Sequence, residues 1–273
     1  MKANKISKRK TGRRVLAFAA VAALAAAAVA LAAAYGRLRG LWLEQSVVTD
    51  FASQVRITDG RMVRSDVVAL GFGLKNGANL ALIDFEERRR EMLKKIPNIR
   101  EITISRHLPN RVEITVEERT PVVRLGIKGR KDNSGRVADT DGVVFISSSG
   151  TQMLPTIRER PDAATQKGKR LGGMPLSALR LIETSRDRFP QLGIIEVDAS
   201  KSDYVTAVFA DDYVLAKIAW DGMQEPSDAM MPSLISRLDR LTKAVSANID
   251  KSIRIWNATQ DGPVCGNTNR GFL

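Results

Sequence analysis

The chain has 273 residues, a formal net charge of +13 and 44% hydrophobic residues. This length suits one or two domains with buried cores. A strongly basic chain is a candidate for nucleic-acid binding, but seven Lys and Arg residues and no acid lie within residues 1–14, so about half of the excess charge belongs to a short tail. The single cysteine, Cys265, excludes a disulfide within the chain.

Residues 15–35 form an uncharged run of 21 residues. As a helix this run would cover roughly 30 Å, the thickness of a bilayer core. Many basic residues precede it, whereas Arg37 and Arg39 are the close ones that follow. The positive-inside rule therefore predicts a transmembrane helix with residues 1–14 in the cytoplasm and the rest of the chain across the membrane. Topology and anionic lipid account for the basic tail, so we predict a membrane association and no nucleic-acid partner.

Two other interpretations of the apolar run remain open. Thirteen of its residues are Ala, which favours insertion less than Leu does, so a soluble Ala-rich helix is one alternative. The sequence Ala32-Ala33-Ala34 fits a signal-peptidase site, and cleavage after Ala34 is the other. The apolar run is longer than the 7–15 residues usual in signal peptides, which favours a retained anchor.

The first extracytoplasmic module is predicted at residues 51–120, after a linker at 36–50. A short strand at Val55–Ile57 is followed by a brief helix N-capped by Ser65, and then by a helix with a capping box from Asp84 to Glu87. A hairpin completes the module, and its second strand alternates inward-facing Val112, Ile114 and Val116 with polar residues. The expected order of elements is βααββ.

A second domain is predicted at residues 121–258. Its predicted elements are a hairpin around Asp141-Gly142, a long mobile loop at 147–173, a helix at 176–189, strands at 194–197, 204–209 and 213–220 with a turn at Asp211-Asp212, an amphipathic helix at 231–245 and a last strand at 253–256. Residues 259–273 are expected to form a flexible tail. The predicted fold class is α+β, in which a mixed α/β domain with an antiparallel sheet follows the first module.

Candidate catalytic residues are scarce. The one histidine, His107, stands in a predicted turn far from Cys265 in the sequence, and neither has the partners that a triad or metal site needs. The Asp139–Gly142 stretch lacks the downstream oxygen ligands of a calcium loop. Glu117 and Glu118 are neighbours on one strand and point to opposite faces, so they cannot act on one bond. We predict a non-enzymatic protein with no cofactor, no metal and no small-molecule substrate.

Residues 55–123 resemble the POTRA module of the FtsQ/DivIB family of bacterial cell-division proteins. The resemblance rests on the hairpin Arg106–Val112 and on Val116–Pro121, which reads "V-x-E-R-x-P". The stretch Val137–Phe145 is similar to the "D-x-x-G-x-x-F" turn that opens the β-domain of that family. The family's "D-L-R" is replaced in the closing strand by Ser252–Trp256. Tail, anchor, POTRA module and β-domain follow in the family's order.

The resemblance implies a divisome scaffold in the cell inner membrane, with periplasmic domains that bind FtsB/DivIC-like and FtsL-like proteins at the division septum and help control septal peptidoglycan synthesis. Binding would occur by β-augmentation at an exposed sheet edge. We expect this edge near Ile253, Ile255 and Trp256, with the POTRA module as a second docking surface; a core position for Trp256 is the alternative. Two other functions compete: a POTRA-bearing accessory of protein export or outer-membrane assembly, and a membrane-anchored enzyme.

Overall fold

The computed structural model describes residues 4–58, 60–131, 134–147, 150–210, 214–248 and 252–268. The chain divides into two compact units. The first consists of residues 1–90 and 102–116, and the second of residues 91–101 and 117–273.

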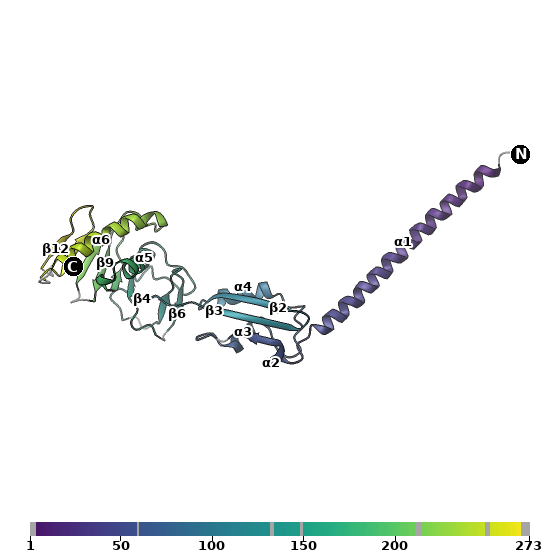
Figure 1. The fold of residues 1–273 in the computed structure, drawn as a ribbon, viewed down its shortest axis with the longest axis horizontal. Helices are drawn as coiled ribbons and strands as arrows, with labels where there is room; N and C mark the ends of the chain where they lie inside the picture. Colours follow the sequence, from purple (N-terminus) through teal and green to yellow (C-terminus); the bar gives the residue numbers. More distant parts are fainter. Residues whose placement is uncertain are drawn as a thin grey trace. The chain divides into compact units, whose positions relative to one another are not determined.

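A single helix, α1 (Asn4–Gln45), opens the chain (Figure 1). Its segment Ala22–Gln45 is long and apolar enough to cross a membrane. Residues 36–45, the first part of the predicted linker, continue this helix. Gly36 and Gly40 each cost only about 1 kcal/mol in a helix, and the Leu-rich residues around them favour it. The helix ends where the Ser46 hydroxyl donates to the Trp42 carbonyl at 2.7 Å.

The POTRA elements have the predicted βααββ order, preceded by a one-turn helix. They are α2 (Phe51–Gln54), β1 (Val55–Ile57), α3 (Ser65–Phe72), α4 (Phe85–Lys95), β2 (Ile99–His107) and β3 (Arg111–Glu118). The strands form a sheet of order β1-β3-β2, in which β1 runs parallel to β3. Val112, Ile114 and Val116 are buried, which confirms the predicted alternation on β3.

Helix starts in the first unit follow local capping chemistry. The predicted cap of α4 is confirmed, because the Glu87 amide donates to Asp84 Oδ1 at 2.9 Å. The prediction for α3 is wrong by one residue: Arg64 occupies the N-cap position and Ser65 is the first helical residue. Gly73, in the left-handed conformation that suits glycine, ends α3.

The second unit is built on a mixed sheet. Its strands are β4 (Val123–Ile127), β5 (Arg136–Ala138), β6 (Val144–Ile146), β7 (Thr156–Glu159), β8 (Ile194–Asp198), β9 (Val205–Phe209), β10 (Leu215–Ile218), β11 (Ile255–Ala258) and β12 (Cys265–Asn267). The order across the sheet is β12-β11-β10-β9-β8-β7-β4-β5-β6. The expected antiparallel pairs are present, but β4/β7, β7/β8 and β10/β11 are parallel. The predicted turn at Asp211-Asp212 lies outside the described residues.

Two long helices cover one face of this sheet. They are α5 (Gly173–Arg188) and α6 (Met231–Ala247), and the short helices η1 (Pro190–Leu192) and η2 (Asp228–Met230) adjoin them. Helix α5 lies against β7 and β8, and α6 lies against β11 (Figure 1). The core between helices and sheet contains Leu179, Leu234, Leu238 and Leu241 from the helices, and Leu125, Ile157, Val197, Ala207, Ile218 and Trp256 from the strands.

Two predictions for this domain are wrong. The mobile loop expected at 147–173 contains β7, which pairs with both β4 and β8 in the middle of the sheet. The flexible tail expected at 259–273 contains β12. Both strands are short and polar in sequence, so neither shows the hydrophobic alternation on which strand prediction depends.

Candidate protein-binding edge

Strand β11 is not the last strand of its sheet. Ile255 and Trp256 lie on β11, which pairs with β10 on one side and with β12 on the other, and Ile253 precedes the strand. Ile255 and Trp256 are buried. Trp256 belongs to the core beneath the helices, the alternative that the sequence left open. The terminal strand at this end of the sheet is therefore β12, whose residues are all exposed.

Strand β12 lies directly on the residues that sequence reasoning selected. Gly266 is the register partner of Trp256. A Cβ atom at position 266 would lie 2.5 Å from Ile253 Cγ2 and 3.0 Å from Trp256 Cζ3. Only a residue without a side chain allows so close an approach. Ile253 and Trp256 thus form the support of the terminal strand.

The connection from β11 to β12 is held on α6 by charge. Asp261 accepts from Arg237 at 2.7 Å and faces Arg240 at 3.5 Å. The Arg237 side chain is 3% exposed, whereas that of Asp261 is 72% exposed. A buried guanidinium held by a surface carboxylate fixes the turn, because the arginine loses its hydration and needs the acid as partner. Residues missed by sequence reasoning here are Gly266 and Asp261, since neither stands in a hydrophobic pattern.

The opposite end of the sheet is covered. The Val144 amide of β6 donates to the Lys169 carbonyl at 2.9 Å, and the Gly168 amide donates to the Val144 carbonyl at 2.8 Å. The Asn98 amide group donates to the Ile146 carbonyl at 2.8 Å. Backbone groups of β6 are therefore already paired, and β12 is the end of the sheet that remains open to a further strand in the described part of the chain.

The POTRA sheet offers a second edge in the first unit. Strand β1 ends that sheet and borders a groove of about 460 Å³. The groove is lined by Phe51, Val55, Ile57, Ser65, Asp66, Ala69, Leu70 and Leu74. Leu70 is 83% exposed and Val67 is 43% exposed, whereas Val68, Ala69 and Phe72 of α3 are buried in the core. An exposed leucine beside an apolar groove is typical of a docking surface.

The titratable groups of the described residues do not assemble into a reactive site. Among the described residues, no cluster of three or more His, Cys, Asp or Glu side chains could hold a metal ion. His107 ends β2 in an exposed position, and Cys265 lies exposed on β12.

Burial raises the pKa of the Glu183 carboxyl above its ordinary value despite the opposing hydrogen bond and charge of Arg180. Burial also acts to raise the pKa of Asp198, but hydrogen bonds from Lys128 and Ser200 outweigh it and lower the pKa below its ordinary value.

Comparison with known families gives one match. Residues 52–119 match the family described as "POTRA domain, FtsQ-type". These residues fall within the module predicted at 51–120 and cover β1, α3, α4, β2 and β3. No curated protein matches the chain. Residues 52–119 are therefore an FtsQ-type POTRA domain.

Proposed function

We propose that the chain is a non-enzymatic divisome scaffold of the bacterial inner membrane. In this proposal, α1 anchors the protein with residues 1–14 in the cytoplasm, and the POTRA and β-domains bind FtsB/DivIC-like and FtsL-like proteins at the division septum. Through these contacts the protein helps control septal peptidoglycan synthesis. The observation that carries the proposal is the FtsQ-type POTRA domain that follows an apolar helix.

The proposed binding mechanism is strand addition at β12. An edge strand directs alternate backbone N–H and C=O groups away from its sheet, and a partner strand can pair with them. Support comes from the asymmetry of the sheet, because β6 is covered by residues 168–171 whereas β12 ends the order at the other side. The role first expected for Ile253, Ile255 and Trp256 becomes indirect: these residues support the binding strand.

Paired substitutions test whether the β12 backbone is the contact. Proline at positions 265 and 267 removes two backbone N–H groups, whichever side of the strand they face. The variant Cys265→Pro/Asn267→Pro should lose co-purification of FtsB/DivIC-like and FtsL-like proteins and should fail to complement a depletion strain. The matched variant Cys265→Ala/Asn267→Ala keeps the backbone donors and should retain both properties.

Two results would refute strand addition at β12. One is full partner recovery with the proline variant, and the other is equal loss of partner with the alanine variant, since the latter assigns binding to side chains.

Fluorescent fusions of the intact chain add a test of the function itself. If the fusion gathers at midcell and cells depleted of the protein form filaments, the protein is a division scaffold. If the fusion stains the envelope uniformly and depletion causes outer-membrane defects, the protein is instead an accessory of protein export or outer-membrane assembly.

The POTRA groove is proposed as the second docking surface. Leu70 would insert its side chain into an apolar partner, because it is the most exposed apolar residue bordering the groove. Leu70→Glu should reduce partner recovery roughly tenfold or more, as expected when a charge replaces an interface leucine. Leu82→Glu, at a leucine that is 71% exposed and outside the groove lining, is the control and should leave recovery unchanged.

A further inference from the structure

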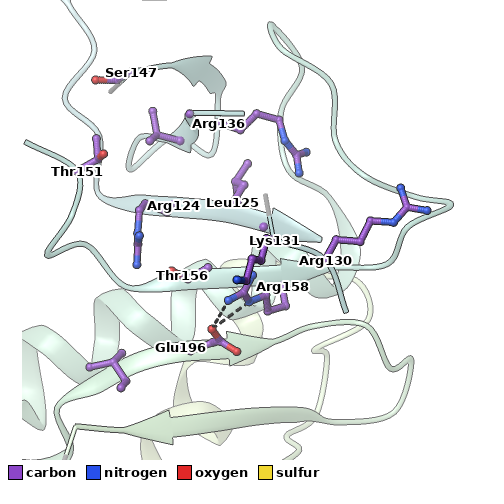
Figure 2. A pocket seen from close by; sticks show the side chains of 14 residues that line it. Arg124, Leu125, Arg130, Lys131, Arg136, Ser147, Thr151, Thr156, Arg158 and Glu196 are labelled. Atoms are coloured by element: carbon purple, nitrogen blue, oxygen red, sulfur yellow. Dashed lines mark hydrogen bonds and ion pairs between the residues drawn. The ribbon is translucent and has the colours of Figure 1, made fainter. Parts of the chain in front are cut away.

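A basic pocket of about 420 Å³ lies in the β-domain, apart from β12 (Figure 2). Strand alternation places it on the sheet face opposite α5 and α6. Leu125 of β4 and Ile157 of β7 belong to the core beneath the helices, so their neighbours Arg124 and Arg158 point to the other face. Among the described residues, the cationic ones that line the pocket are Arg124, Arg130, Lys131, Arg136 and Arg158, and the acidic one is Glu196.

Arg158 is held in a defined position. Its Nε and Nη2 atoms donate to the same carboxylate oxygen of Glu196 at 3.0 and 2.9 Å (Figure 2). The third nitrogen, Nη1, lies over Gly126, where a Cβ atom would come within 2.7 Å of it. Arg158 and Glu196 are each about one-third exposed, so the pair faces the pocket instead of closing it. A glycine below and a carboxylate beside the guanidinium preorganise it for a ligand.

Part of the positive charge that lines the pocket has no acidic partner among the described residues. Arg136 is paired with Glu159 at 2.9 Å, and Glu196 is engaged by Arg158. Arg124 donates through Nε to the Leu154 carbonyl at 3.2 Å and has no acidic partner in the described part of the chain. Arg130 and Lys131 likewise form no ion pair with a described residue. Three cations thus line one cavity without an acidic partner among the described residues, an arrangement that attracts an anion.

We infer that this pocket binds an acidic peptide segment of a partner protein, with carboxylates on Arg124 and on Nη1 of Arg158. Arginine guanidinium groups match carboxylates in a planar, two-bond geometry. The cations extend from β4 through the β4–β5 connection to β7, which suits an elongated ligand better than a single small anion. Ile195, 39% exposed, also lines the pocket and gives an apolar contact that a peptide side chain can use.

The test uses the full chain in nanodiscs of zwitterionic lipid and a library of random dodecapeptides. Binding is compared between the wild type, Arg124→Gln/Arg158→Gln, and the matched variant Arg111→Gln/Arg188→Gln. The matched variant loses the same charge at arginines that do not line the pocket. The informative peptides are those that bind the wild type and the matched variant but bind Arg124→Gln/Arg158→Gln at least tenfold more weakly. We expect these peptides to be enriched in Asp and Glu.

Further arms make the outcome decisive. Changing the acids of a selected peptide to Asn and Gln should abolish its binding, and 1 mM inorganic phosphate should not displace it. Gly126→Ala should weaken binding of the same peptide, because the added methyl group moves Arg158. The inference is wrong if no peptide discriminates between the proteins, if discriminating peptides are not acidic, if phosphate displaces them, or if Arg111→Gln/Arg188→Gln loses binding equally. The circular dichroism spectrum of each variant should match that of the wild type, which shows that the variant is folded.

Discussion

Glu159 is a fully buried carboxylate on β7 and shows how a single residue can hide a strand from sequence analysis. It accepts from Arg136 Nη1 at 2.9 Å and from the Thr165 amide at 3.0 Å. In the sequence, the charges at 158 and 159 suggest a solvated loop, because buried ions are rare. The burial of Glu159 depends on partners that are distant in the chain, and no local pattern contains that information.

Removing this buried acid should be costly. Glu159→Leu removes the carboxylate that pairs with the Arg136 guanidinium, whose side chain is 12% exposed. The expected loss is about 3 kcal/mol, equivalent to a fall of roughly 6–12 °C in Tm for a domain of this size. Thermal unfolding of the detergent-solubilised chain by circular dichroism measures it. Arg136→Leu/Glu159→Leu should recover at least half of the loss; a double variant as unstable as the single one would show that the ion pair is not the cause.

Asp198 makes stability depend on pH in the acidic range. Its carboxylate binds Lys128 at 2.6 Å and the Ser200 amide at 2.9 Å, and these bonds lower its pKa despite burial. Between the lowered pKa and the ordinary value of about 3.9, the unfolded chain binds more protons, so stability rises with pH there. The contribution is complete above about pH 4 and is lost as pH falls through the folded-state pKa.

Asp198→Asn should therefore lower the Tm at pH 7 by about 2–4 °C, for a loss near 1 kcal/mol. The difference from the wild type should shrink as the pH falls below about 4. Lys128→Gln should have a smaller effect, because the Ser200 hydrogen bond remains. A Tm difference that stays constant from pH 7 to the acid range would contradict this origin. Thermal scans across that pH range make the comparison.

Elements with a regular hydrophobic period were predictable from the sequence, and elements held by tertiary contacts were not. The alternation of Val112, Ile114 and Val116 identified β3, and the capping pair at Asp84 and Glu87 located the start of α4. Strand β12 escaped prediction because Cys265-Gly266-Asn267 carries no apolar alternation and depends on close contact with Ile253 and Trp256. The sequence predicted a sheet edge near Ile253–Trp256, whereas the sheet ends one strand further out, at β12.

The terminal strand should detach when its close contact is blocked. Gly266→Val places a branched side chain where even a Cβ atom would overlap Ile253. We expect amide hydrogen exchange of residues 265–267 to accelerate at least tenfold, while the other strands keep their protection. Gly262→Val is the control in the same connection, because a Cβ atom there meets nothing within 4 Å. Equal acceleration in both variants would show that the hairpin is loose irrespective of Gly266.

For the whole molecule, the order of parts agrees with a membrane-anchored scaffold: an apolar helix, an FtsQ-type POTRA domain, and a mixed-sheet domain with one covered and one open end. The chain has a single cysteine, and it lies exposed on β12. The orientation of the chain can therefore be tested with the natural sequence.

A membrane-impermeant maleimide should label Cys265 in intact spheroplasts, because the proposal places β12 on the periplasmic side. Labelling should be unchanged when the inner membrane is permeabilised. Cys265→Ala controls for labelling at other groups. Reaction that requires permeabilisation would place the β-domain in the cytoplasm, and with it the whole scaffold proposal would fail.

Protection of β12 in the assembled complex is the most direct measurement of the central claim. Amide hydrogen exchange of the chain purified with its FtsB/DivIC-like and FtsL-like partners would be compared with that of the chain alone. The account predicts that the amides of residues 265–267 become at least tenfold slower to exchange in the complex, as expected when a partner strand pairs with them. Unchanged exchange at β12, with protection elsewhere on the chain, would contradict recruitment through this edge.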